Sequence, residues 1–205
     1  MPAFQAVLFD FDGVLVDSEP IHFRCWRDLL APYEIELDWE TYKGNYIGVS
    51  TREMLEHICR KAANGTTPEI LLGLIPRKRG LFIELMCREL PLAPDCRAML
   101  TSLSGLRLGV VTSSNRREVE PLLAAAGIRD CFDVLVCGSD VRAQKPSPEP
   151  YLKAIQLLGT SSALAVEDSD AGVESAQAAG IEVIRVAGPT EVWPALRERL
   201  GRGCL

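Results

Sequence analysis

No stretch of this 205-residue sequence approaches the roughly 18 consecutive apolar residues that a membrane-spanning helix needs, so no membrane partner is expected. Basic residues are not in excess either. The chain has 22 Lys and Arg against 28 Asp and Glu, a net charge of −6, which argues against nucleic acid as the main partner. Internal repeats and low-complexity tracts are also missing. With 47% hydrophobic and 24% charged residues, the composition is that of an ordinary soluble globular protein.

Histidine is scarce, and the cysteines form no metal-binding pattern. There are two histidines and an odd number of cysteines, seven, with no Cys-x-x-Cys, which argues against both a disulfide framework and a structural zinc site. The first five residues carry no basic stretch, and the apolar run that follows has no cleavage pattern, so we predict no targeting signal and a cytoplasmic protein. Most of the cysteines are expected to be small buried hydrophobic residues, at positions Cys25, Cys59, Cys87, Cys96, Cys131, Cys137 and Cys204.

Short apolar runs without alternation are the first positive signal. Runs of this kind are typical of strands that are buried on both faces, as in a parallel sheet. Five of them occur, at Ala6–Phe9, Leu108–Val111, Val134–Val136, Leu164–Val166 and Val183–Val186.

Helical patterns separate the later runs. Apolar residues share one face over Arg116–Ala126, Pro150–Leu158 and Asp170–Ala179, and each segment is followed by a glycine suited to ending a helix. Helices that alternate with parallel strands predict an α/β fold, with a Rossmann-like parallel sheet and helices on both of its faces.

The interval after the first strand breaks this alternation. It shows helical patterns only, and it is too long for a single crossover in a compact sheet. We therefore predict an inserted α-helical cap domain at residues 17–91, and a catalytic core formed by residues 1–16 and 92–205. Domain lengths of about 150 residues agree with one domain that carries an insertion.

Polar residues follow the apolar runs, and ligands bind at the carboxyl ends of strands in an open parallel sheet. Three carboxylate or hydroxyl clusters and one lysine should therefore meet at one edge. They are Asp10-Phe11-Asp12-Gly13, Thr112-Ser113-Ser114-Asn115, Lys145-Pro146 and Glu167-Asp168-Ser169.

Asp10 and Asp12 can face one pocket, because residues i and i+2 of an extended chain point the same way, about 6.6 Å apart. A polar strand end with a turn at Asp12-Gly13 explains the pair as well. Such a turn does not explain the further carboxylates of Glu167 and Asp168, which would repel the first two without a cation. The combined set predicts a hard divalent ion, Mg²⁺ rather than zinc or copper.

Hydroxyls at the start of a helix, together with its free N–H groups, can bind an anion. Each feature also has a simpler explanation when taken alone. Thr112–Asn115 could only cap the helix, and Lys145 could be an exposed loop lysine. Taken together, anion donors, a cation, a metal and a carboxylate nucleophile indicate phosphoryl transfer.

The four ordered motifs resemble those of the haloacid dehalogenase superfamily, from Ala6 to about Val186. They are Asp10-Phe-Asp12-Gly13-Val-Leu, the strand that ends at Thr112, Lys145-Pro-x-Pro148 and Glu167-Asp168-Ser169-x-x-Gly172. The similarity is greatest to the β-phosphoglucomutase-like and sugar-phosphate phosphatase subgroup, through Asp17-Ser-Glu-Pro, His22-Phe-Arg-x-Trp26 and Gly48-Val-Ser-x-Arg52-Glu.

The resemblance implies that Asp10 is the nucleophile, which becomes an aspartyl-phosphate, and that Asp12 is the general acid and base. It also implies that Asp10, the carbonyl of Asp12 and Asp168 hold Mg²⁺, with Glu167 close by. The phosphoryl oxygens would be bound by Thr112, Ser113, Ser114, Asn115 and Lys145.

The cap is expected to select the substrate through His22, Trp26, Arg52 and Lys78. His22 and Trp26 equally suit the cap's own core, and Lys78, within Arg77-Lys78-Arg79, also suits a solvated helix face. The expected partner is a small phosphorylated metabolite such as a sugar phosphate, and the chain is expected to be a monomer or weak oligomer. Hydrolysis is the predicted outcome, with a sugar-phosphate mutase as the alternative. A non-catalytic binding module on the same fold is the third hypothesis.

Overall fold

The computed structural model describes residues 4–62 and 64–201, which divide into two compact units. One unit contains the residues up to Asp17 and from Leu90 onward, and the other is Ser18–Glu89. Cys204 lies outside the described residues. Of the described helices, none has both the length and the apolar character needed to cross a lipid bilayer.

The first unit is built on a parallel five-stranded sheet of order β3-β2-β1-β4-β5. All four residues of β1 are fully buried, as the unalternating sequence predicted for the central strand. The strands are β1 Ala6–Phe9, β2 Arg107–Val111, β3 Val134–Val136, β4 Ala163–Glu167 and β5 Glu182–Arg185. The predicted parallel sheet is confirmed, and its strand bounds differ from the predicted ones by a single residue at most.

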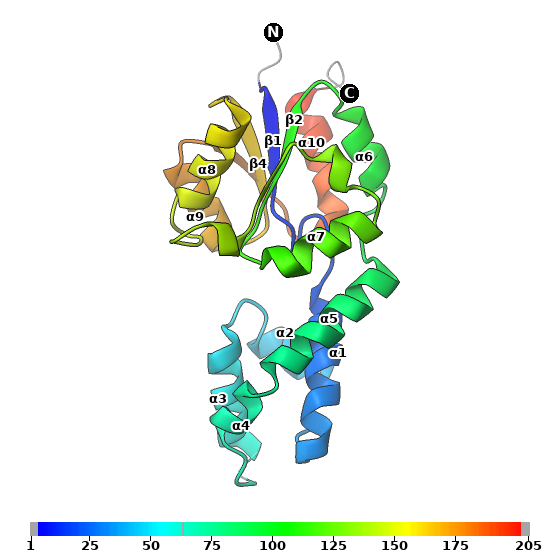
Figure 1. The fold of residues 1–205 in the computed structure, drawn as a ribbon, viewed down its shortest axis with the longest axis vertical. Coiled ribbons are helices and arrows are strands. Elements are labelled where there is room, and N and C mark those ends of the chain that lie inside the picture. The colour runs from blue at the N-terminus through cyan, green and yellow to red at the C-terminus, as the bar shows by residue number, and fades with distance from the viewer. Residues whose placement is uncertain (1–3, 63, 202–205) are drawn as a thin grey trace. The chain divides into compact units, whose positions relative to one another are not determined.

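Helices cover both faces of this sheet. In Figure 1, α8 (Glu149–Leu158) and α9 (Asp170–Ala178) lie on one side of the strands, and α6 (Cys96–Ser102), α7 (Arg116–Ala125) and α10 (Val192–Leu200) lie on the other. Helices α7, α8 and α9 are the three predicted ones, and each is within a residue of its predicted bounds. Helices α6 and α10 were not predicted.

The second unit is entirely helical in its regular structure. An aromatic and aliphatic core, which includes Trp26, Leu30, Tyr42 and Leu55, holds it together. Its helices are α1 Glu19–Leu30, α2 Trp39–Asn45, α3 Thr51–Ala62, α4 Pro68–Leu72 and α5 Ile75–Glu89.

Both units also contain short 3₁₀ segments. They are Ala31–Tyr33 in the second unit, and Arg129–Cys131, Gly138–Asp140 and Pro189–Glu191 in the first.

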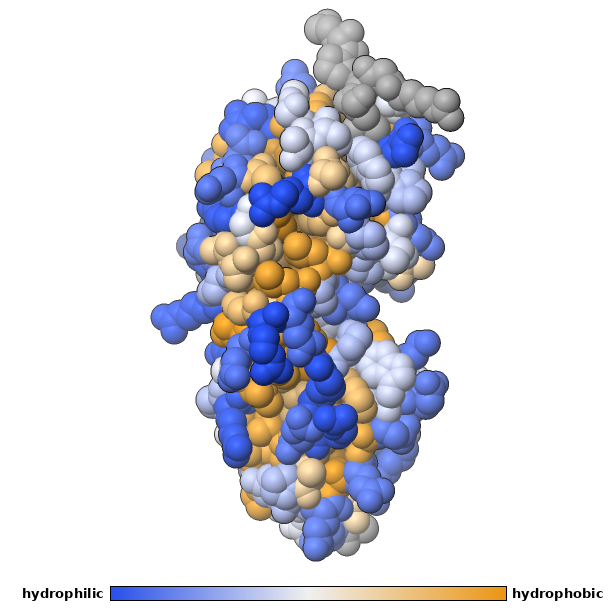
Figure 2. Space-filling view, turned by 90° about the vertical axis from the view of Figure 1, so that its right-hand side faces the viewer, coloured by the Kyte–Doolittle hydropathy of each residue, from blue (hydrophilic) through white to orange (hydrophobic). Residues whose placement is uncertain are grey.

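Polar side chains are spread over both units on the face that Figure 2 shows, with apolar side chains between them. Large apolar side chains that are exposed by two fifths or more are few among the described residues: Ile47, Val49, Ile70, Leu152 and Leu157. A few exposed apolar side chains are normal on a folded protein.

Candidate active site

The sheet order itself brings the predicted motifs together. Strand β1 lies between β2 and β4, so the residues that follow these three strands are neighbours at the carboxyl edge. The amide of Asp10 donates to the carbonyl of Val166 at 3.0 Å, which extends the ladder between β1 and β4 by one rung. Asp10, Thr112 and Glu167 are all buried at this edge.

Lys145 reaches the same edge from the loop before α8. Its side chain is 4% exposed, so the alternative of an exposed loop lysine is wrong. Its ammonium donates to Oδ1 of Asp10 at 2.9 Å, to Oε1 of Glu167 at 2.5 Å and to the carbonyl of Val111 at 2.8 Å. All three protons of the ammonium therefore have an acceptor.

Two polar anchors hold the loop that carries Lys145. The carboxylate of Glu149 accepts the amides of Arg142 and Ala143, each at 2.9 Å. The hydroxyl of Ser175 donates to the carbonyl of Ser147 at 2.5 Å. The Lys145–Pro146 peptide bond is cis. The hydrogen bonds of Glu149 and Ser175 fix the backbone on both sides of the lysine.

Three carboxylates converge beside this lysine. Asp10, Glu167 and Asp168 each offer an oxygen, and these oxygens lie within 4.8 Å of one another. Two glycines make the close packing possible. A Cβ on Gly13, whose φ is +75°, would lie 1.9 Å from Oδ2 of Asp168, and one on Gly172 would lie 1.9 Å from Oε2 of Glu167. No other residue fits at either position without displacing a carboxylate.

Burial and mutual repulsion disfavour the charged forms of this cluster. Burial, and next the charge of Asp10, raise the pKa of Glu167 to about 7 and that of Asp168 to about 6. Burial would lower the pKa of Lys145, but the carboxylates of Asp10 and Glu167 outweigh it and raise that pKa. The single ammonium of Lys145 cannot neutralise the three carboxylates of Asp10, Glu167 and Asp168 when all of them are charged.

These residues fit a divalent cation. All the donors are oxygens, which hard cations prefer. Oε2 of Glu167 is buried and has no hydrogen-bond partner among the described residues, and an unpartnered buried carboxylate oxygen is costly unless a cation supplies the missing charge. The predicted metal ligands Asp10, Asp168 and Glu167 are therefore together in one cluster.

The side chain of Asp12 is directed elsewhere. Its Oδ2 accepts a hydrogen bond of 2.6 Å from the hydroxyl of Ser114, one of the predicted anion-binding residues. The amide of Ser114 in turn donates to the hydroxyl oxygen of Thr112 at 3.0 Å. The loop after β2 thus orients the side chain of Asp12. The sequence position of Asp12 did not indicate this contact.

The remaining residues of that loop divide between two roles. The side chain of Asn115 accepts from the amide of Arg117 at 3.0 Å and caps α7, so the simple capping explanation holds for this residue. Ser113 is exposed. A Cβ on Gly138 would lie only 2.2 Å from the carbonyl oxygen of Ser113. The 113–114 backbone therefore packs directly on Gly138, which fixes its path.

Two of the predicted cap residues form one cluster. The imidazole of His22, on α1, stacks on Phe82, on α5, with the ring centroids 4.1 Å apart and the planes 7° apart. The ammonium of Lys78 donates to Nδ1 of His22 and lies 4.4 Å from the centroid of Phe82. His22 and Phe82 thus fix the direction of the Lys78 side chain.

Burial, and next the charge of Lys78, lower the pKa of His22 to about 3. The unfolded chain binds this proton near pH 6.5, so the stability that neutral His22 contributes is complete above pH 6.5 and is lost as the pH falls towards 3. Between pH 7 and pH 5, we expect the free energy of unfolding to fall by about 2 kcal/mol more in the wild type than in His22→Gln.

Urea unfolding at several pH values measures this difference. His57→Gln, which removes the other histidine of the chain, controls for the loss of an imidazole as such. If the free energy of unfolding changed equally with pH in the wild type and in His22→Gln, His22 would not be held neutral by the fold.

The other two predicted cap residues have different environments. Trp26 is 3% exposed and belongs to the core of the Ser18–Glu89 unit. Arg52, on α3, has a side chain that is 67% exposed, with Glu56 at 3.8 Å as a loose ion-pair partner. A role of either residue in substrate binding stays a prediction.

The sequence did not reveal Tyr151 as a site residue. It lies on the buried face of α8, with Ala154 and Leu158, within the helix that the apolar pattern predicted over Pro150–Leu158. Its hydroxyl donates to Oε1 of Glu167 at 2.5 Å. The sequence did contain one signal for Tyr151, a hydroxyl on an otherwise apolar helix face. A buried tyrosine hydroxyl usually has a hydrogen-bond partner.

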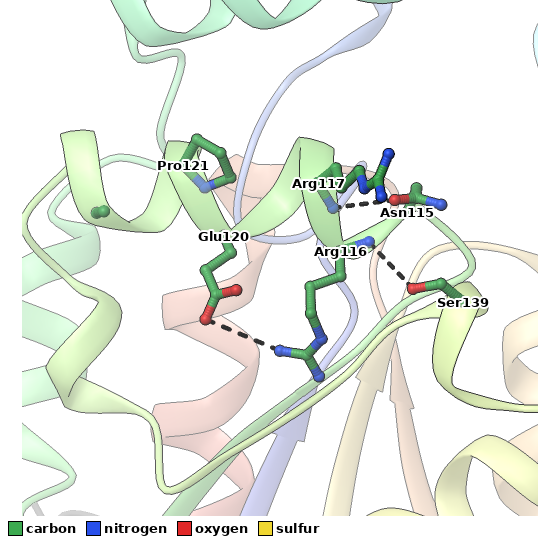
Figure 3. Close-up of a pocket in the computed structure, with 7 residues that line it drawn as sticks. Asn115, Arg116, Arg117, Glu120, Pro121 and Ser139 are labelled. Carbon is green, nitrogen blue, oxygen red and sulfur yellow. Dashed lines mark hydrogen bonds and ion pairs between the residues drawn. The ribbon is translucent and has the colours of Figure 1, made fainter.

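A surface pocket beside α7 lies next to the capping residue Asn115 but is not lined by the carboxylate cluster (Figure 3). Arg116, one of the two arginines that line it, has acidic partners: the guanidinium pairs with Asp140 at 2.6 Å and lies 3.8 Å from Glu120. Arg116 thus serves to join α7 to the 3₁₀ segment Gly138–Asp140.

Comparison with known proteins places the chain in a family. Residues 7–186 match the family model of haloacid dehalogenase-like hydrolases. The chain is 30% identical over 190 residues to Protein CbbY of Rhodobacter capsulatus, covering 88% of this chain and 84% of CbbY. It is 32% identical over 183 residues to the phosphorylated carbohydrates phosphatase of Thermotoga maritima, covering 88% of this chain and 83% of that protein.

A solved structure extends the similarity to the fold. CbbY of Rhodobacter sphaeroides, crystallised as a mutant in complex with xylulose-(1,5)bisphosphate, superposes with a TM-score of 0.74 at 29% identity. The match covers 91% of this chain and 88% of that chain. This chain therefore belongs to the haloacid dehalogenase-like hydrolase family.

Proposed function

We propose that this chain is a Mg²⁺-dependent phosphatase that hydrolyses a small phosphorylated metabolite, such as a sugar phosphate, through a phosphorylated Asp10. The observation that carries the proposal is the pairing of Asp10 with Lys145, at 2.9 Å, beside the carboxylates of Glu167 and Asp168. The relatives support the substrate class, since one is a phosphatase of phosphorylated carbohydrates and CbbY binds a sugar bisphosphate.

The metal of this proposal is Mg²⁺, because every side-chain donor of the cluster is a carboxylate oxygen. Asp10, Asp168 and the main-chain carbonyl of Asp12 would hold it, with Glu167 adjacent. When bound, the ion neutralises charge on the phosphoryl group and on the carboxylates around it.

In the first chemical step, a carboxylate oxygen of Asp10 attacks phosphorus, and the bond from phosphorus to the substrate's ester oxygen breaks. Asp12, in its protonated form, gives its proton to that departing oxygen, so the product leaves as an alcohol. In the second step, Asp12 takes a proton from water as the water attacks the phosphorus, which releases phosphate and restores Asp10. The hydrogen bond from Ser114 keeps the Asp12 carboxyl in one orientation through both steps.

The phosphoryl oxygens need donors as charge shifts onto them. Thr112, which is buried at the end of β2, and the amide of Ser113 supply these donors in our proposal. Lys145 supplies the fixed positive charge. Ser114 and Asn115 would act through the orientation of Asp12 and of the start of α7, respectively, rather than by direct contact.

We propose that the Ser18–Glu89 unit is the cap domain that selects the substrate. Lys78 is the best placed of its candidates, because the contacts with His22 and Phe82 direct its ammonium. Arg52 is the most exposed of them and is available to an anionic group. Trp26 would contribute through the packing of the cap core.

A panel of phosphorylated sugars and related metabolites, assayed for phosphate release with Mg²⁺ and then with a chelator, tests the proposal. We expect turnover of at least one sugar phosphate with Mg²⁺, a loss of at least about 100-fold on chelation, and recovery when Mg²⁺ is restored. A panel without any turnover would instead favour a non-catalytic binding module.

The same assay separates hydrolysis from the mutase alternative. Both reactions use the same nucleophile, and they differ in whether water or a second sugar hydroxyl takes the phosphoryl group. With β-glucose 1-phosphate as substrate, a phosphatase releases free phosphate, whereas a mutase forms glucose 6-phosphate. Formation of glucose 6-phosphate without phosphate release would replace our proposal by the mutase.

A further inference from the structure

Tyr151 is the largest fully buried side chain of the protein as far as the structure describes it. It packs in the apolar cluster between β-strands and α8, together with Ala154, Leu158 and Ala165. Its hydroxyl nevertheless leaves this cluster and donates to Oε1 of Glu167 at 2.5 Å. The core of the sheet thus makes a direct polar contact with the acidic cluster.

Oε1 of Glu167 is held by two donors at once. The ammonium of Lys145 donates to it at 2.5 Å, in addition to the Tyr151 hydroxyl. The same ammonium lies 5.5 Å from the centroid of the Tyr151 ring. Lys145 and Tyr151 therefore both hydrogen-bond to Glu167, and they interact with each other at cation–π distance.

The second oxygen of Glu167 has the opposite environment. Oε2 is buried without a hydrogen-bond partner among residues 4–62 and 64–201. The carboxylate as a whole lies against the main chain at Gly172, where a Cβ would come within 1.9 Å of Oε2 and 2.4 Å of Oε1. Because both donors act on Oε1, the carboxylate is held in one rotation about its terminal bond, with Oε2 left for a cation or for a water bound to it.

We propose that Tyr151 is a positioning residue of the metal site, which acts by holding the carboxylate of Glu167 through Oε1, so that Oε2 would be left to a cation. This inference rests on the proposed function, because the cation is the Mg²⁺ of that proposal. The fully packed ring is anchored by the core, so its hydroxyl is a fixed point to which Glu167 is aligned. Residues that orient metal-site carboxylates typically change metal affinity or activity by about 10- to 100-fold when they are replaced.

Tyr151→Phe removes the hydroxyl and retains the packed ring. We expect about tenfold weaker binding of Mg²⁺, measured by isothermal titration calorimetry, and a smaller rise of Tm on addition of Mg²⁺. At subsaturating Mg²⁺, kcat should fall by a similar factor. At saturating Mg²⁺, KM for the phosphate ester should be unchanged, because Tyr151 does not contact the substrate.

Tyr42→Phe is the matched control. Tyr42 is also buried, at 5% exposure, and its hydroxyl also donates to a glutamate, Oε2 of Glu19 at 2.9 Å. The two variants therefore lose the same kind of bond, but only one of these bonds involves the acidic cluster. Tyr42→Phe should lower the Tm of the metal-free protein without changing the affinity for Mg²⁺.

Fluorine NMR of the chain labelled with 3-fluorotyrosine gives a second measurement that needs no change at position 151. The chain has four tyrosines, so the resonance of Tyr151 is assigned by replacing Tyr33, Tyr42 and Tyr46 in turn by phenylalanine. Titration with Mg²⁺ should shift the Tyr151 resonance and leave that of Tyr42 in place.

The inference is overturned if Tyr151→Phe binds Mg²⁺ as tightly as the wild type, or if the Tyr151 resonance stays in place while calorimetry shows that Mg²⁺ binds. These outcomes are distinct from failure of the proposed function, which would appear as the absence of Mg²⁺-dependent phosphate release in the wild type itself.

Discussion

Asp10→Asn is expected to lower kcat for phosphate release by about 10⁴-fold or more, because an amide oxygen is too weak a nucleophile to form the phosphorylated intermediate. The change is isosteric, and the amide oxygen of the variant would still accept a hydrogen bond from Lys145. It also removes one of the charges that raise the pKa values of Glu167 and Asp168. The variant should therefore fold, and its Tm without metal should stay within a few degrees of the wild type.

Asp130→Asn provides the same chemical change at an exposed position and should leave kcat within about twofold of the wild type. Beryllofluoride, which mimics a phosphoryl group on a carboxylate, adds a direct assay. The wild type should bind it at Asp10 in the presence of Mg²⁺, and Asp10→Asn should not. Phosphate release near the wild-type rate in Asp10→Asn, or an adduct on another residue, would refute the assignment of the nucleophile.

Lys145→Met is expected to have the second-largest effect, on stability as well as on activity. The lysine is almost completely buried and separates two carboxylates, so its removal leaves buried charge without compensation, at a cost of about 3–5 kcal/mol. Loss of the fixed charge should also lower kcat by about 10²- to 10³-fold.

The loss of stability should depend on pH in a defined direction. The pKa of Glu167 is already raised to about 7, and without the ammonium it would rise further, so this carboxyl is neutral at acidic pH. In urea unfolding with a chelator present, Lys145→Met should thus be closer to the wild type at pH 5 than at pH 8.

Lys153→Met is the matched control, since Lys153 is a partly exposed lysine of α8 whose ammonium donates to the carbonyl of Asp140. Lys153→Met should lower the free energy of unfolding by less than about 1 kcal/mol. Equal stability of the two methionine variants would contradict the role of Lys145 as the cation that balances the cluster.

The sequence predicted the parts of the site that depend on strand ends. Asp10, Thr112 and Asp168 each follow a buried apolar run, and the rule for open parallel sheets was enough to bring them together. Lys145 was harder, because it lies on a loop, and only the combination with the other motifs distinguished it from an exposed lysine. The inserted helical segment was visible because it broke the alternation of strands and helices.

Contacts between side chains on separate elements could not be predicted in this way. Tyr151 follows the apolar pattern of α8, and no spacing relates it to Glu167. The stacking of His22 on Phe82 joins α1 to α5 across a long interval of the chain. Periodicity indicates which face of an element is buried, but it contains no information on which residue of a distant element meets that face.

The sheet order has a further consequence for the synthesis of the protein. The strand that bears Asp10 is made first, yet its two hydrogen-bonded neighbours are β2 and β4, which begin at Arg107 and Ala163. A nascent chain therefore leaves one edge of β1 unpaired until β2 has been made, and the other edge unpaired until β4 has been made. The reactive centre comes into being only late in translation, when the second acidic motif emerges.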